Sequence, residues 1–156
     1  MPFIFNALPT KNVRELQSGG YDANGQLPEK IISDGEGNPC RHCLKNIPEG
    51  QGILIAAYRP FKNIQAFAET GPIFLCEDAC ERSEETTDLP EIFQGVERIL
   101  IRGYCEEERI VYGTGAVVPM VELEQGLAKI FKNPKVTSVH MRSATNNCYQ
   151  AKVTRS

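Results

Sequence analysis

The chain has 156 residues, of which 41% are hydrophobic and 24% charged, and it carries a net charge of −3. Its length fits one domain, so we predict a single domain spanning residues 1–156. The composition is typical of a globular fold and excludes a disordered chain, a collagen and a long coiled coil. We expect no membrane span, because no apolar run approaches the roughly 20 residues that one needs. The negative net charge argues against a general nucleic-acid binder.

The N-terminal half is predicted to contain short strands separated by turns. A strand is favoured at 52–61, where the apolar run GILIAAYRPF ends near Pro60, and a second at 71–76, GPIFLC. The other expected elements here are a strand over 1–8, a helix over 10–18 with Thr10 as its cap, and a short strand over 30–33.

The C-terminal half is predicted to contain two hairpins with a helix between them. The first hairpin joins strands 98–105 and 109–118, with three glutamates at its tip. A helix then begins near Met120, and Asn133-Pro134 ends it. The second hairpin joins strands 136–142 and 148–154. Many strands and two helices predict an α+β fold with a mostly antiparallel sheet, one face of which the helix from Met120 covers.

The apolar residues of the second hairpin predict its register. Val139 and Met141 alternate in the first strand, as do Tyr149, Ala151 and Val153 in the second. All of them share one face if Met141 pairs with Tyr149 and Val139 pairs with Ala151. We therefore predict this pairing for the hairpin.

The same register would group three polar residues on the opposite face. It places Arg142 directly across from Cys148, with His140 as a diagonal neighbour. A cation beside a thiol favours the thiolate, which is the nucleophilic form. His140, Arg142 and Cys148 are therefore a candidate catalytic trio. The alternative interpretation is a plain polar surface.

Four of the six cysteines form two closely spaced pairs. Cys40-x2-Cys43 resembles a zinc knuckle and precedes an apolar strand, and Cys76-x3-Cys80 lies at the end of another strand. Zinc needs four ligands in a tetrahedron, and thiolates suit this borderline-soft ion. We predict a structural zinc site on these four cysteines, closed because it leaves no open ligand position. The alternative is four unrelated thiols, some of them buried in the core.

The cysteines also allow a redox interpretation. Residues 1–12 lack a basic segment and a cleavage site, so we expect a cytoplasmic protein with reduced thiols. His42 lies between Cys40 and Cys43, where it could stabilise a thiolate and poise a redox dithiol. In thioredoxin-like enzymes a long helix follows such a motif, whereas here Pro48 and a strand follow.

Charge is unevenly distributed along the chain. The last 32 residues carry six basic and no acidic side chains, and the first 124 carry a net charge of −9. The plain interpretation is that the basic C-terminal part packs near the acidic loops. A small anionic ligand on the basic part is the alternative.

Several stretches together resemble a known family. They are CRHCLKNIPEG, AAYRPF, AETGPIFLCEDACER and VHMRSATNNCY. In this order they resemble DUF1203, a family of small bacterial proteins that is defined as a domain of unknown function. The resemblance implies a soluble, single-domain protein and supplies no activity. It also implies that some relatives carry histidine at the position of Cys76 and that others lack Cys43 and His42, so zinc would be a subgroup feature. It places Arg142 and Cys148 in the closing motif of the family.

The sequence favours a small cytoplasmic binding or interaction module that zinc stabilises locally. Its partner would be a protein or a small anionic ligand. The alternative is a thiol-dependent enzyme that uses either the candidate catalytic trio or the Cys40/Cys43 dithiol. Whether the chain is an enzyme stays open at this point.

Overall fold

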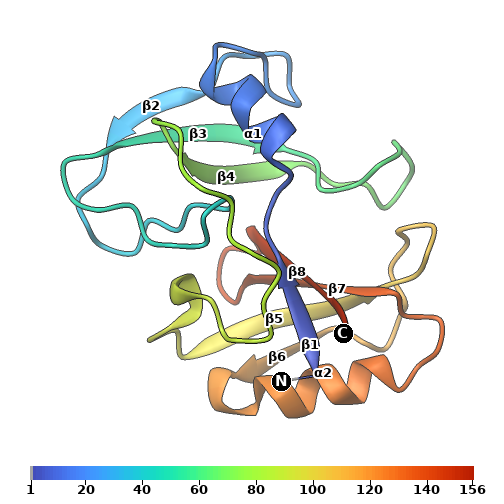
Figure 1. Ribbon diagram of the computed structural model, residues 1–156. Coiled ribbons are helices and arrows are strands. Elements are labelled where there is room, and N and C mark those ends of the chain that lie inside the picture. The colour runs from blue at the N-terminus through green and yellow to red at the C-terminus, as the bar shows by residue number, and fades with distance from the viewer. Residues whose placement is uncertain (1) are drawn as a thin grey trace.

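The computed structural model describes residues 2–156 and contains two antiparallel sheets (Figure 1). The five-stranded sheet has the strand order β1-β8-β7-β5-β6, and the three-stranded sheet has the order β2-β3-β4. The elements are β1 (Phe3–Asn6), α1 (Thr10–Gln17), β2 (Glu29–Ile32), β3 (Gly52–Tyr58), β4 (Gly71–Cys76), β5 (Arg98–Tyr104), β6 (Ala116–Pro119), α2 (Leu123–Phe131), β7 (Ser138–Ser143) and β8 (Tyr149–Arg155), with short 3₁₀ turns at Glu91–Phe93 and Met120–Glu122. The predicted α+β class is confirmed.

Helix α2 covers one face of the five-stranded sheet, and the three-stranded sheet lies on the other side (Figure 1). The buried residues of α2 recur with helical spacing, at Leu123, Leu127, Ile130 and Phe131. They pack in one core with inward-facing strand residues such as Ile101. The predicted covering helix is therefore confirmed.

The second core belongs to the three-stranded sheet. Leu54 of β3 pairs with Leu75 of β4, and both side chains are buried. Val13 and Leu16 of α1 join this core from the helix, and fully buried Cys40 joins it from the loop before β3. The sequence predicted these elements but not their separation into two sheets, because sheet membership is decided by contacts distant in sequence.

The register predicted for the last hairpin is wrong. Val139 pairs with Val153 and Met141 pairs with Ala151, and a β-bulge then follows. Because of the bulge, Arg142 pairs with Tyr149. The extra residue turns the Tyr149 ring to the opposite face, where it joins the second core. The prediction treated Tyr149 as one more apolar residue of a regular strand.

The second strand of the first hairpin is shorter than predicted. It was expected over 109–118, but β6 covers only Ala116–Pro119 and pairs with β5. The preceding residues form a turn, in which Gly113 has a φ of +88° and the Thr114 hydroxyl donates to the Val111 carbonyl. That left-handed backbone conformation ends strand geometry before residue 114. Within residues 2–156, neither helix is long and apolar enough to cross a membrane.

Candidate metal centre

The first cysteine pair lies on a tight turn. The amide of Cys40 donates to the Lys45 carbonyl at 3.0 Å, and the amide of Leu44 donates to the Cys40 carbonyl at 3.0 Å. Leu44 adopts a φ of +55°, a left-handed conformation that is unfavourable for this residue type. Its side chain is 1% exposed, so core packing offsets the strain. The turn brings Cys40 and Cys43 to the same side.

The second pair lies where β4 ends. Cys76 is the last residue of β4, and Cys80 follows in the next loop. Two side chains of α1 hold this loop: Arg14 donates to the Cys80 carbonyl at 2.7 Å, and Gln17 donates to the Cys76 carbonyl at 2.9 Å. Sequence analysis missed both residues. Their i, i+3 spacing on a predicted helix was the available signal.

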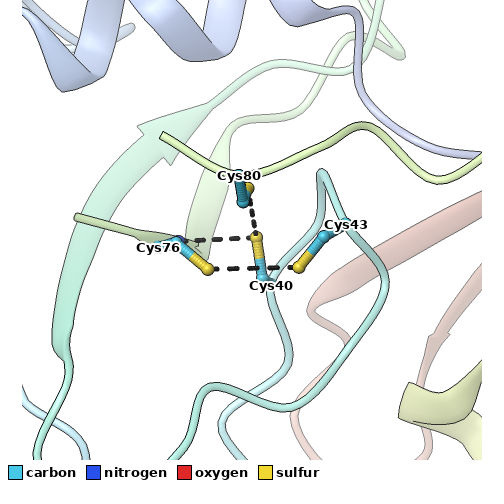
Figure 2. Close-up of side chains that lie close together, drawn as sticks. All are labelled: Cys40, Cys43, Cys76 and Cys80. Carbon is cyan, nitrogen blue, oxygen red and sulfur yellow. Dashed lines mark hydrogen bonds between the residues drawn. The ribbon is translucent and has the colours of Figure 1, made fainter. Parts of the chain in front are cut away.

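The four cysteine side chains point toward one another (Figure 2). Their sulfur atoms all lie within 4.8 Å of one another. The Sγ atoms of Cys40 and Cys80 are 3.9 Å apart, and those of Cys43 and Cys76 are 4.0 Å apart. A tetrahedron with metal–sulfur bonds of about 2.3 Å has edges of about 3.8 Å. The cluster therefore has the size of a tetrahedral metal–thiolate site, and all four thiols are free of disulfide bonds.

Cys40 is the thiol of the cluster that most readily loses its proton. Backbone amides of His42 and Cys76 direct their N–H groups at its sulfur, at 3.5 and 3.4 Å. Hydrogen bonds with the other three thiols, that of Cys43 foremost, hold the pKa of Cys40 well below its usual range. The same shared hydrogen bonds raise the pKa values of Cys76 and Cys80. A thiophilic cation would displace the protons that these two thiols keep.

His42 is a partner of the cluster rather than a member of it. Its ring is fully buried, with Nδ1 3.1 Å from Cys80 Sγ and Nε2 2.9 Å from Thr10 Oγ1. Burial lowers the pKa of His42, so the ring is neutral and has one N–H. A metal-bound thiolate can only accept, so with an ion in the cluster Nδ1 would donate to Cys80 and the Thr10 hydroxyl would donate to Nε2. Such outer partners orient metal ligands.

A buried cation lies beside the cluster. Arg41 is 4% exposed, and its guanidinium donates to the Tyr149 carbonyl at 2.8 Å. Burial lowers the pKa of Arg41 to about 10, whereas the nearby thiols of Cys148 and Cys40 favour its charged form. Arg41 therefore remains charged at neutral pH. Its charge offsets part of the negative charge that four thiolates would bring.

The chemistry of these four ligands suits a thiophilic ion. Tetrahedral sites with four sulfurs hold zinc or iron. A cavity of about 460 Å³ borders the cluster and is lined in part by Cys43, Cys76 and Cys80. An ion and a chelator in solution can therefore reach these sulfurs. Four thiolates would occupy all four coordination positions of a tetrahedral ion, so this arrangement supports a structural role.

The structure buries two members of the candidate catalytic trio and leaves the third half-buried. His140 and Arg142 are 2% and 3% exposed, and Arg142 lies 3.2 Å from His140 Nδ1 and 3.1 Å from Glu69. Cys148 is half-buried in the loop before β8, and its Sγ contacts the Asn146 carbonyl at 3.8 Å. Within residues 2–156, no hydrogen bond joins Cys148 Sγ to the other two. The catalytic role of this trio stays a prediction.

Comparison with known proteins identifies one family. The family model described as "Protein of unknown function (DUF1203)" matches residues 37–155, a segment that includes all four clustered cysteines. No match was found among curated proteins or among solved structures.

Proposed function

The chain belongs to the DUF1203 family, whose function is not established, and on this premise we propose that it is a binding or interaction module stabilised by one structural zinc ion. Cys40, Cys43, Cys76 and Cys80 would hold the ion. The observation that carries the proposal is the convergence of four free sulfurs within 4.8 Å. Zinc is the favoured ion, because it is redox-inert and accepts a tetrahedron of thiolates without strain.

The position of the site supports a structural role. It ties the loop before β3 to the end of β4, and Cys40 is part of the second core. An ion at this point would cross-link segments that are far apart in the chain. Because four thiolates leave no position for substrate, the function of the protein would rest on binding elsewhere on the molecule. Reduced thiols are required for the site, which favours a cytoplasmic location.

The test is the metal content per chain, measured by elemental mass spectrometry on untagged protein purified under reducing conditions. We expect about one zinc per chain. The variant Cys76→Ala/Cys80→Ala should contain none. The matched control, Cys105→Ala/Cys148→Ala, also removes two cysteines but lies outside the cluster, and it should retain the metal.

Three outcomes would count against the proposal. Metal-free wild-type protein that also fails to take up zinc would reject it, and a reversible Cys40–Cys43 disulfide in that protein would favour the redox dithiol. Iron in place of zinc would overturn the identity of the ion. Equal metal loss in both double variants would show that the ion is held elsewhere.

A further inference from the structure

A second cleft lies between the two sheets, and none of its lining residues is a cysteine. Its volume is about 470 Å³, within the range of about 300 to 1,000 Å³ that is typical of small-molecule sites. Its walls come from the end of β1 and the start of α1, from β8, and from the segment 58–62, which begins at the last residue of β3. Only the fold brings these segments together.

The cleft is electropositive, although the whole chain has a net charge of −3. Arg59, Lys62, Arg82 and Lys152 line it, against the single carboxylate of Glu108. Backbone carbonyls hold the guanidinium of Arg82. In the part of the chain that the structure describes, the side chains of Arg59, Lys62 and Lys152 make no hydrogen bond or ion pair. Cations gathered in this way repel one another, and a bound anion would relieve the repulsion.

Aromatic side chains form another part of the lining. Tyr58, Phe61 and Tyr149 all border the cleft, and the rings of Tyr58 and Tyr149 are 6.5 Å apart. Tyr149 is 8% exposed, and its hydroxyl has no hydrogen-bond partner within residues 2–156. Burial raises the pKa of Tyr149, so the hydroxyl stays protonated as a donor. Aromatic faces bind planar rings by stacking.

We propose that this cleft binds a small phosphorylated molecule that carries a planar ring. The phosphate would lie among the unpaired side chains of Arg59, Lys62 and Lys152, and the ring would lie against the aromatic lining. Three unpaired cations match a dianionic group with three acceptor oxygens better than a single carboxylate. The hydroxyl of Tyr149 provides a further donor. The site is independent of the metal centre.

The ligand class is tested by calorimetric titration of the full chain with three probes: adenosine 5′-monophosphate, uridine 5′-monophosphate and pyridoxamine 5′-phosphate. At least one probe should bind saturably, with a Kd below about 1 mM. Its unphosphorylated counterpart and ribose 5-phosphate should bind at least about tenfold more weakly, because each lacks one half of the recognised chemistry. Failure of all three probes at millimolar concentration, or equal binding of the unphosphorylated counterpart, would overturn the proposal.

Variants then locate the binding site. Arg59→Gln/Lys152→Gln should raise the Kd of the probe by about tenfold or more. Lys62→Gln, at an exposed position, should raise this Kd by a smaller factor. The control Lys132→Gln/Lys135→Gln removes the same charge from exposed positions outside the cleft and should leave the Kd unchanged. Equal weakening in the cleft variant and the control would mean general attraction only and would overturn the site.

Discussion

The hydrogen-bonded chain from Thr10 through His42 to Cys80 should set the metal affinity of the cluster. Replacing His42 by leucine removes both ring nitrogens at a fully buried position. It deprives the Cys80 sulfur of the donor 3.1 Å away and leaves the Thr10 hydroxyl without its acceptor at 2.9 Å. Replacing Thr10 by valine removes only the second of these hydrogen bonds.

General magnitudes for such hydrogen bonds give the size of each effect. A hydrogen bond to a charged group contributes about 1.5 to 3 kcal/mol, and loss of an outer partner lowers metal affinity by about 10- to 100-fold. These two figures agree, so His42→Leu should weaken zinc binding by about 30-fold, equivalent to about 2 kcal/mol. Thr10→Val loses a neutral hydrogen bond of about 1 kcal/mol and should weaken zinc binding by about fivefold.

The assay is competition for zinc with a chelating dye, combined with urea unfolding of the metal-free protein. The matched control is His140→Leu, because His140 is also buried but its hydrogen-bond partner is Arg142. The control should lower the free energy of unfolding and leave the zinc affinity unchanged. If His42→Leu lowers only the stability of the metal-free protein and not its affinity, His42 fills space in the core and does not orient Cys80.

Two further predictions concern stability. Zinc at 100 times its Kd should raise the free energy of unfolding by about 2.7 kcal/mol, both in wild-type protein and in the control Cys105→Ala/Cys148→Ala. The measurement is urea unfolding with and without zinc. An equal rise in Cys76→Ala/Cys80→Ala would contradict the site. Burial and nearby cations hold the pKa of His140 well below 6.5 in the folded state, so the unfolded chain binds more protons below that pH. The free energy of unfolding should therefore fall as pH drops below about 6.5, by up to about 1.4 kcal/mol per pH unit. In metal-free protein the variant His140→Phe should show a shallower fall. Identical slopes in the variant and the wild type would show that His140 does not cause this pH dependence.

The sequence by itself predicted most of the elements and the four cysteines that are the candidate metal ligands. The apolar run at 71–76 and the helical spacing from Leu123 to Phe131 are local patterns, and both elements form as predicted. The two cysteine pairs were recognisable because tight turns and strand ends present closely spaced side chains to one point. The sequence predicted their convergence because one ion would need four ligands, and the structure brings the four sulfurs together.

Only the tertiary structure decided what surrounds these residues. The bulge that turns Tyr149 into the second core depends on packing between the two sheets, which no pattern within one hairpin contains. The same packing buries His140 and Arg142, whereas the sequence could not decide whether their face lines a cleft or is a plain polar surface. The contact of His42 with Thr10 joins residues 32 positions apart. Sequence periodicity reports which side of an element is buried, whereas the partner that covers it is set by contacts between distant segments.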